Sequence, residues 1–549
     1  MLMKRIFNII GFVPMILGLM VFQSCKTNQD GFGEDPYAGG REQLGVVFER
    51  LNRPLPAVRP DDVFEISVRG LLKHESNVKV FINEELAQVV SLTDSTMEVR
   101  VPLTVSSGGL KVKINDQIFF GPRVPIEGNV SFDTDYAVRN GFNSSVNYIL
   151  PATSGSDLWI LGNFTNFENQ ASATVFRRNI HKINANGESA ATTAGSFAVQ
   201  KGADGGINSM VRLPDGKYMV GGGIYGMENL NNHRYNLGHI TRLNSEGSID
   251  SMVLELINTT PERPANAYDT LPAFNAYLGA TINSGFGGIT ALFALPDTSV
   301  IAVGNFGVHG YIDYRYSSRE SKLYVNTLVN NIVRLKADGR VDSTFGYNNA
   351  GANGFVNGAV ETNDGKIIVV GSFTSFNAKS ANRVVAFNKD GSIHAGFNVG
   401  TGANDEIYSI TYNKVLNKIA LAGRFTSFNG QATRGVVLLN ADGSVDNSFV
   451  LGDVEQRIPS YAYVMNSGRV LVSGDFVRYN GVHRSKLLIL ESSGEALQQY
   501  NNIGEFSGRI NHVIETTSSL GYPALLIGGS IGLADGRVVG NLFRLEVRN

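Results

Sequence analysis

A short motif that recurs along the chain decides the fold: Gly371-Ser372-Phe373-Thr374-Ser375-Phe376-Asn377. It returns as Gly423-Arg424-Phe425-Thr426-Ser427-Phe428-Asn429 and as Gly474-Asp475-Phe476-Val477-Arg478-Tyr479-Asn480, with an earlier copy, Gly162-Asn163-Phe164-Thr165-Asn166-Phe167. Weaker copies begin at Gly223, Gly304 and Gly529, which brings the number of units to seven. Internal similarity of this kind is the signature of a repeat architecture.

Two further elements accompany the motif in the clearer copies. An Asp-Gly pair between apolar runs follows it, as in 335–345 and 439–449, and a strand-like run precedes it, as in 364–370 and 215–220. Asp-Gly between apolar runs is a strong hairpin signal, because the turn requires positive φ. Each unit therefore holds about four short strands, and seven such units predict a seven-bladed β-propeller.

The motif residues have separate roles in such a ring. We expect the glycine to permit a close backbone approach and the phenylalanines to pack between neighbouring blades. The block resembles the short β-propeller repeats of secreted bacterial proteins, with the patterns D-G-x-x-D-x-x-F and D-G-K-I-x-V-x-G-x-F, most clearly over 330–480.

The two ends of the repeat block predict how the ring closes. The last unit ends at 543–547, with no Asp-Gly hairpin after it, and a strand-like run, 127–132, precedes the first unit. We expect 127–132 to complete the last blade and so to seal the ring. The alternative is an open solenoid, which needs atypical polar caps.

A smaller β-domain precedes the ring. Polar and apolar residues alternate with period two in the runs 62–68, 78–82, 97–101 and 111–114, which predicts a small antiparallel β-sandwich. The segment resembles an IPT/TIG immunoglobulin-like domain in Arg59-Pro60-Asp61-Asp62, Val68-Arg69-Gly70-Leu71, 91–97, Val101-Pro102 and Gly108-Gly109. That resemblance implies a spacer or docking module.

The first residues read as a targeting segment. Lys4 and Arg5 precede an apolar run that ends at the chain's one cysteine, Cys25. A membrane-spanning helix is the weaker interpretation, because Asn8, Gly11 and Pro14 interrupt the run. The layout resembles a bacterial lipoprotein signal, which implies lipidation of Cys25 and attachment to the outer membrane. The polar, acidic stretch that follows resembles the surface-export tethers of Bacteroidota lipoproteins.

The predicted organisation is therefore all-β, with a small immunoglobulin-like sandwich followed by a seven-bladed β-propeller. We assign 1–24 to a lipoprotein signal peptide, 25–45 to a lipidated tether, 46–125 to the sandwich and 126–549 to the propeller. The composition fits this division: 62 glycines, only 17% charged residues and a net charge of −2. Such values exclude a disordered chain and argue against nucleic acid as a partner.

The sequence carries few signs of catalysis or of a cofactor. The glycines at 221–226 fit G-x-G-x-x-G, but no helical pattern follows, so we expect no dinucleotide. The eight histidines are scattered without metal-ligand spacing, and we expect neither a cofactor nor a metal. Asp342, Asp442 and Asp446 recur at turn positions, where capping explains them; calcium held by Asp-Gly turns stays open.

Departures from the repeat indicate where binding takes place. The interval from Gly223 to Gly304 is 81 residues, against 52 from Gly371 to Gly423, and a second insertion begins at Tyr311. Loops that exceed the needs of the scaffold tend to carry function, and Tyr and Arg are favoured at binding hot spots. The candidate binding residues are Tyr268, Tyr277, Tyr311, Tyr314, Arg315, Tyr316 and Arg319. Alternatively, these are solvated loops whose aromatic residues cover the blade edge.

The arrangement resembles lipoproteins encoded beside SusC/SusD-like importers of Bacteroidota. The resemblance implies a cell-surface, non-catalytic binding or accessory subunit of such an importer, with a peptide or oligosaccharide ligand. A propeller glycosidase or polysaccharide lyase is the enzymatic alternative, and it needs carboxylates or His, Tyr and Arg converging on the ring's axis. A structural scaffold of a surface complex is the third. Trp159, the one tryptophan, lies in an apparent core strand, which favours peptide or protein over glycan.

Overall fold

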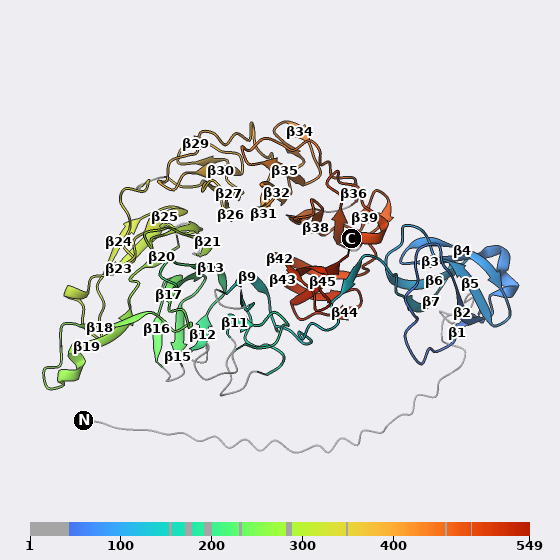
Figure 1. Cartoon of the computed structure of the whole chain (residues 1–549), viewed down its shortest axis with the longest axis horizontal. Coiled ribbons are helices and arrows are strands. Elements are labelled where there is room, and N and C mark those ends of the chain that lie inside the picture. Colours follow the sequence, from blue (N-terminus) through green and yellow to red (C-terminus); the bar gives the residue numbers. More distant parts are fainter. Residues whose placement is uncertain are drawn as a thin grey trace, which may run out of the picture. The chain divides into compact units, whose positions relative to one another are not determined.

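Seven antiparallel sheets stand around a common axis and form the blades of a β-propeller (Figure 1). The computed structural model describes residues 43–152, 156–170, 178–190, 200–229, 233–280, 288–346, 350–455, 458–484 and 486–548. Cys25 and most of the predicted tether lie outside these residues. No helix in the described part of the chain is long and apolar enough to cross a membrane. The predicted fold class, a sandwich followed by a seven-bladed propeller, is confirmed.

Each blade is built on three strands that pair in the order inner, middle, outer. From blade 1 to blade 7 these are β9, β10 and β11 (Val146–Pro151, Leu158–Gly162, Ile180–Ile183); β13, β14 and β17 (Ile207–Arg212, Tyr218–Gly222, Ile240–Leu243); β21, β22 and β25 (Ile289–Ala294, Val300–Gly304, Ile332–Leu335); β26, β27 and β30 (Val356–Glu361, Ile367–Gly371, Val384–Phe387); β31, β32 and β35 (Ile407–Asn413, Lys418–Gly423, Val436–Asn440); β37, β38 and β41 (Pro459–Val464, Val470–Gly474, Leu487–Leu490); β42, β43 and β45 (Phe506–Thr517, Pro523–Ala534, Leu542–Val547). The inner strands of successive blades contact one another in an unbroken circle that returns from β42 to β9.

The blades are held together by seven apolar cores, one between each pair of neighbours. The middle strands are buried on both faces, so they read as continuous apolar runs such as Ile367–Gly371. The first phenylalanine position of the motif lies in these cores and is at most 1% exposed in every blade, with isoleucine in place of phenylalanine in blades 2 and 7. From blade 1 to blade 7 the residues are Phe164, Ile224, Phe306, Phe373, Phe425, Phe476 and Ile531. The expected packing of the motif phenylalanines between blades is confirmed.

The motif glycine is required by a close backbone approach that every blade repeats. At Gly371 a Cβ would lie 1.9 Å from the carbonyl oxygen of Phe355, the residue that precedes the inner strand. The same contact occurs at the other six motif glycines, with distances of up to 2.5 Å at Gly474. The glycine N–H also donates to the residue before the outer strand, as from Gly371 to Arg383 at 3.1 Å.

That residue before the outer strand has positive φ in all seven blades, between +63° and +81°. Its members are Asn179, His239, Asn331, Arg383, Gly435, Lys486 and Asn541. The hydrogen bond from the motif glycine to this residue corrects the motif start in blade 2, which the sequence placed at Gly223. There it is the N–H of Gly222, not of Gly223, that donates to the carbonyl of His239, at 3.0 Å.

The expected fourth strand is much reduced in the first five blades. The segment after the turn that follows the outer strand contributes single bridges: Ile183 with Ser189, Leu243 with Ile249, Leu335 with Val341, Phe387 with Ile393, and Leu439 with Val445. The turn is Asp-Gly in blades 3, 4 and 5, Asn186-Gly187 in blade 1 and Glu246-Gly247 in blade 2, and the arm after it does not extend into a ladder.

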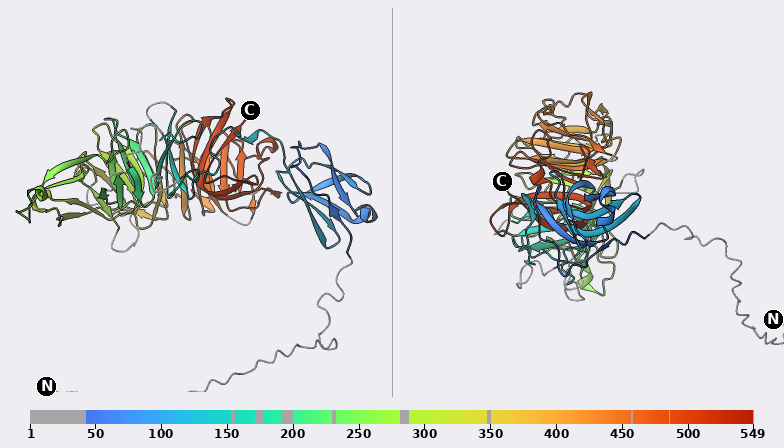
Figure 2. Two further views of the ribbon diagram at one scale, coloured as in Figure 1. Left: turned by 90° about the horizontal axis from the view of Figure 1, so that it is seen from below. Right: turned by 90° about the vertical axis from the view of Figure 1, so that its right-hand side faces the viewer.

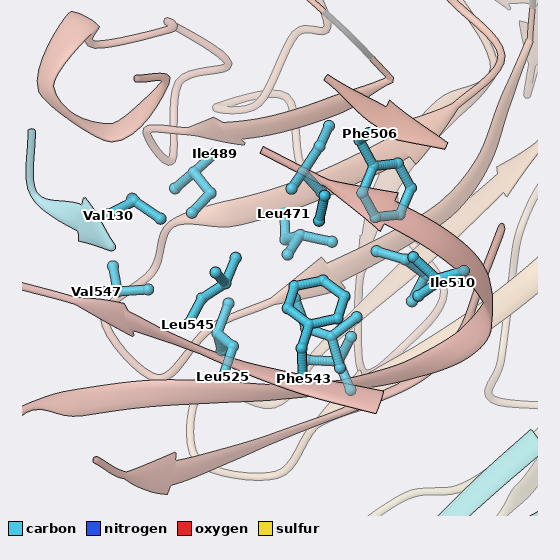
Figure 3. Close-up of a cluster of buried hydrophobic side chains, with 14 of the residues drawn as sticks. Val130, Leu471, Ile489, Phe506, Ile510, Leu525, Phe543, Leu545 and Val547 are labelled. Carbon is cyan, nitrogen blue, oxygen red and sulfur yellow. The ribbon is translucent and has the colours of Figure 1, made fainter. Parts of the chain in front are cut away.

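Blade 7 receives a true fourth strand from the other end of the domain. The strand β8 (Val130–Phe132) pairs antiparallel with β45, Val130 opposite Val547. Figure 3 shows Val130 pointing into the same apolar cluster as Leu545 and Val547. The predicted closure of the last blade by 127–132 is confirmed.

A buried ion pair follows β8 directly. Asp133 accepts hydrogen bonds from Arg544 Nε on β45 at 2.8 Å and from the Ser519 N–H at 2.8 Å. The Asp133 and Arg544 side chains are only 1% and 3% exposed, and Tyr136 lies against the guanidinium. We call β8 together with this ion pair the seal.

The sandwich is a seven-stranded antiparallel sheet with the order β1-β2-β5-β4-β3-β6-β7. Its strands are Val47–Phe48, Val63–Arg69, Val78–Ile82, Glu85–Leu92, Thr96–Arg100, Gly108–Ile114 and Gln117–Val124, for β1 to β7 in chain order, with the 3-10 turn η1 (Leu72–Asn77) before β3. The four predicted runs match β2, β3, β5 and β6, whereas β1, β4 and β7 were not predicted from the sequence.

The sandwich lies beside the ring (Figure 2), and hydrogen bonds to backbone atoms join it to blades 6 and 7. The buried guanidinium of Arg484 donates to the Thr104 carbonyl at 2.7 Å. The Ser107 N–H donates to the carbonyl of Asn502, whose side-chain amide donates to the carbonyl of Val130 in the seal. The sandwich therefore makes specific contacts with the ring.

Hairpins at the motif loops make the outer edge of the ring. In blades 4, 5 and 6 they are small: β28–β29 (Ser375–Phe376, Lys379–Ser380), β33–β34 (Ser427–Phe428, Gln431–Ala432) and β39–β40 (Arg478–Tyr479, Val482–His483), the last joined by β36 (Val454–Glu455). In blade 2 the hairpin is β15–β16 (Gly226–Asn229, Arg234–Asn236), joined by β12 (Gln200–Asp204), and in blade 7 β44 (Arg537–Val538) pairs with β43. Blade 3 carries the largest additions, described next.

Candidate functional site

The two insertions predicted from the repeat spacing pack against each other on blade 3. The first forms the hairpin β18–β19 (Ser251–Glu255, Tyr268–Pro272), with η2 (Pro264–Ala267) between, and then β20 (Tyr277–Gly279). The second forms β23–β24 (Val308–Ile312, Tyr324–Leu328), with η3 (Tyr314–Tyr316) between, and β20 pairs with β23. The β18–β19 hairpin projects outward from the ring (Figures 1 and 2).

Polar contacts between the insertions fix their relative position. Lys322 Nζ lies 2.8 Å from Asp269 Oδ2 on β19, and both side chains are largely shielded from solvent. The same ammonium group donates to the carbonyls of Ser318 and Arg319. The N–H of Ile257 donates to the carbonyl of Ser317 at 3.0 Å. The projecting module is therefore pre-organised, although closing the ring does not require it.

All seven predicted binding residues lie in this module, and five of them lie on the β18–β19 hairpin or on the segment between β23 and β24. Arg319 Nη1 lies 3.4 Å from Asn266 Oδ1, beside Tyr268 at the start of β19. Burial raises the pKa of Tyr314 to about 12, and the nearby Tyr324 and Asp269 contribute to the rise. Arg315 lies over the ring of Tyr316, at 5.4 Å.

Arg315 is engaged within its own loop. Its guanidinium donates two hydrogen bonds to Asp313, at 2.9 and 2.7 Å, and these bonds hold the pKa of Asp313 below its ordinary value. The loop thus presents the ring of Tyr316, which is 65% exposed, beside a guanidinium that is already paired with Asp313.

The other two predicted residues, Tyr277 and Tyr311, pack against other parts of the protein. The ring of Tyr277 lies against the backbone of Gly238, where a Cβ would come within 2.1 Å of the ring, and against Gly279. Tyr311 lies on the opposite face of the same sheet, under Arg340 at 5.5 Å. Tyr277 is paired with Gly310 and therefore points to the same face of the sheet as Gly310 does. Tyr311 follows Gly310 along β23 and points to the opposite face, so the side chains of Tyr277 and Tyr311 cannot share one surface.

Exposed apolar side chains gather on the module, and several were not predicted. We define the blade-3 platform as Val253, Ile257, Tyr268, Tyr316, Leu323, Tyr324 and Leu328, each at least 46% exposed. No apolar–polar alternation marks the last three in the sequence; the only signal was the aromatic and β-branched content of Tyr324-Val325-Asn326-Thr327, which is typical of a strand.

Polar side chains also gather at one end of the axis, and the sequence analysis missed them. We define the amide belt as Asn147, Asn208, Asn357 and Asn511. Each of them directly follows the inner-strand residue that is paired with the motif glycine of the same blade. Each donates to the next blade, as Asn208 does to the Ile289 carbonyl at 3.0 Å and Asn511 to the Val146 carbonyl at 3.0 Å. These amides tie the inner strands together, which is a structural use.

Farther along the inner strands, Tyr148 and His512 face each other across blades 1 and 7. Their ring centroids are 4.4 Å apart, and burial lowers the pKa of His512 to about 4, so the imidazole is neutral at pH 7. Near the end of β42, Glu515 accepts a hydrogen bond from the Asn466 N–H at 2.7 Å, and burial raises its pKa.

The repeat aspartates cap turns, as the sequence predicted. Asp342 accepts from the N–H and hydroxyl of Thr344, and Asp446 does so from Ser448. Asp442 accepts in the same way from Ser444. Among the described residues, no group of three or more His, Cys, Asp or Glu side chains is placed to hold a metal ion.

A pocket of about 310 Å³ lies at the outer edge of blade 5, away from both the axis and the platform. Its lining includes Phe428, Thr433, Arg434, Val437 and Phe449. It lies between the outer hairpin and the segment after the Asp-Gly turn, where a longer fourth strand would otherwise lie.

Comparisons with protein families match both parts of the chain. Residues 21–122 match the model of a domain of unknown function, DUF5008, and 322–345, 362–397 and 417–449 match a β-propeller domain of unknown function, DUF5122. The DUF5122 matches cover blades 3 to 5, where the repeat is clearest. No curated protein matches the chain.

Among solved structures, the chain is similar to several proteins at low identity and low TM-score. The WD40 β-propeller domain of Doa1 is 13% identical over 76% of this chain and 96% of that one, with a TM-score of 0.35. Auxiliary nutrient binding proteins from Bacteroides thetaiotaomicron and Bacteroides ovatus are 10% and 12% identical, over 77% and 66% of this chain and 95% and 92% of theirs, with TM-scores of 0.26 and 0.20. The number of blades follows from the strand pairing, not from these likenesses.

Proposed function

We propose that the chain is a cell-surface lipoprotein, anchored in the outer membrane through Cys25, that acts as a non-catalytic binding or accessory subunit of a SusC/SusD-like nutrient importer. The blade-3 platform carries this proposal. It is a module that closing the ring does not require, its two insertions are held together by polar contacts, and it has exposed tyrosines at a site where the repeat alone would leave a short turn.

The platform favours a protein or peptide partner over a glycan. Its rings come from tyrosine, and the one tryptophan, Trp159, is 2% exposed in β10 and belongs to the core between blades 1 and 2. Tyrosine suits protein interfaces because it offers a large, fairly rigid contact with a polar end.

The test is purification of the tagged full-length protein from its native membrane. We expect an importer pair to co-purify and expect the Tyr268→Ser, Tyr316→Ser double variant to lose most of it. The control is Phe120→Ser on the sandwich strand β7, since Phe120 is 80% exposed and lies outside the platform. A wild-type protein that purifies alone contradicts the proposal.

One observation favours the enzymatic alternative, a glycosidase or polysaccharide lyase. In the described part of the chain, the buried Nδ1 of His512 has no hydrogen-bond partner, and Tyr148 lies beside it on the axis. Cleavage of a glycan in a panel, abolished by His512→Ala, would support that alternative and overturn the non-catalytic proposal.

A further inference from the structure

The strand β24 forms a free edge of the blade-3 module. It ends the sheet β20-β23-β24, and no strand in the described part of the chain pairs with its other side. The N–H groups of Asp313 and Val329 donate to the carbonyls of Leu323 and Gly307, one pair at each end of the β23–β24 ladder. Because hydrogen-bonded pairs alternate in an antiparallel ladder, the N–H and C=O groups of Tyr324, Asn326 and Leu328 point away from β23.

The composition of β24 does not protect this edge. Tyr324-Val325-Asn326-Thr327-Leu328 has no charge and no proline, the usual devices against strand addition. Tyr324 and Leu328 are 52% and 65% exposed. The corresponding strands β16 and β29, in blades 2 and 4, carry Arg234 and Lys379.

The same position in blade 6 already binds another β-domain of this chain. Arg484 N–H donates to the Val477 carbonyl as Val329 N–H does to Gly307, so Leu328 corresponds to His483. The outward N–H of His483 donates to Glu85 Oε1 on the sandwich strand β4, at 2.8 Å. Arg478 in the same hairpin also lies 3.4 Å from Glu85. An outer hairpin of this propeller thus binds a β-domain through an outward backbone N–H.

We propose that β24 is the docking edge for an extended segment of a partner protein, which adds to the sheet as its fourth strand. This inference deepens the proposed function and rests on it for the existence of a partner. Tyr324, Asn326 and Leu328 share one face with Tyr277, so the added segment would place alternate apolar side chains over that face. Backbone hydrogen bonds would supply affinity, and these tyrosines the selectivity.

A phage-displayed library of linear peptides, panned against the full-length protein, tests the proposal. We expect enriched peptides to slow hydrogen exchange at the amides of Tyr324, Asn326 and Leu328. Asn326→Pro removes one outward N–H and should weaken these peptides at least about tenfold, whereas Asn326→Ala should keep their affinity. Melting curves of both variants verify folding.

A second variant leaves the backbone of β24 unchanged. Leu328→Lys places a charge on the exposed edge and should also abolish peptide binding. Its matched control is Val538→Lys, at the corresponding position of blade 7, where Val538 is 75% exposed. Peptides that bind Asn326→Pro and Leu328→Lys as tightly as the wild type would overturn the proposal, and so would protection confined to the amide belt.

The failure of this inference differs from the failure of the proposed function. If importer proteins co-purify equally with the wild type and Leu328→Lys, β24 is not the docking edge, although the accessory role stands. If no importer protein co-purifies but peptides still add to β24, the docking edge stands without that importer.

Discussion

The seal in blade 7 and the platform on blade 3 are both departures from the repeat, yet they serve opposite purposes. The seal replaces a one-residue bridge by the strand β8 and buries the Asp133–Arg544 ion pair behind it. The platform adds strands outside the ring and leaves Tyr316 and Leu328 more than half exposed. An addition that buries its side chains stabilises the ring, whereas one that exposes them is available for binding.

Removal of the seal should have the largest effect on stability. Deleting 127–137 takes away β8, with its fully buried Val130, together with Asp133. We expect a loss of more than about 5 kcal/mol, enough to unfold many domains. Thermal unfolding checks this, and adding the segment back as a peptide should raise the melting temperature again. An unchanged melting temperature would show that the ring closes without β8.

Asp133→Asn probes the ion pair alone. The Arg544 charge would stay buried without its counterion, which typically costs about 3–5 kcal/mol. Asp405→Asn is the matched control, because Asp405 pairs with Arg424 where both side chains are over 40% exposed; there we expect at most about 1 kcal/mol. Equal losses in urea unfolding would refute the special role of the seal.

Acid should weaken the seal in a defined direction. Burial by itself would raise the pKa of Asp133, but hydrogen bonds from the Ser519 N–H and Arg544 outweigh it and hold the pKa below its ordinary value. The stabilisation is therefore present above about pH 4, the pKa region of the unfolded chain, and is lost as the pH falls through the folded-state value. The Asp133→Asn variant should show a shallower loss of unfolding free energy below pH 4. Identical pH profiles would count against this assignment.

Substitution on the platform should have the smallest effect on stability. Tyr268→Ala and Tyr316→Ala remove exposed rings, so each should change the free energy of unfolding by about 0.5 kcal/mol or less. A loss above 2 kcal/mol in either variant would mean that the module supports the ring.

The sequence predicted those parts of the fold that depend on short-range chemistry. The turn after the outer strand places a glycine at positive φ in blades 1 to 6, and the motif glycine avoids a backbone clash in all seven, so these glycines recur with the blades. Blade 2 was misaligned by one residue because Gly221, Gly222 and Gly223 are chemically identical neighbours. The hydrogen bond to the His239 carbonyl and the close approach to the Gly206 carbonyl distinguish Gly222 from the other two.

The candidate site was predicted less completely, because it depends on which segments meet in space. The insertions were located by their length, but the Lys322–Asp269 contact joins positions 53 residues apart. The sequence predicts Tyr277 as a binding residue, but two of the glycines that its ring contacts, Gly238 and Gly310, lie on other segments, so this packing could not be foreseen. The amide belt had a sequence signal, an Asn after an apolar residue at the start of an inner strand, but its partners are on the next blade.

The seal also determines when the ring can form during folding. Asp133 and Arg544 are 411 residues apart, so the first strand of the propeller to be synthesised must wait for the last. Closing so long a loop is entropically costly, and contacts of high sequence separation form slowly. Until then the apolar faces of blades 1 and 7 do not cover each other, and an incomplete ring is prone to aggregation. Completion of the ring is thus a single late event that both ends of the domain must reach together.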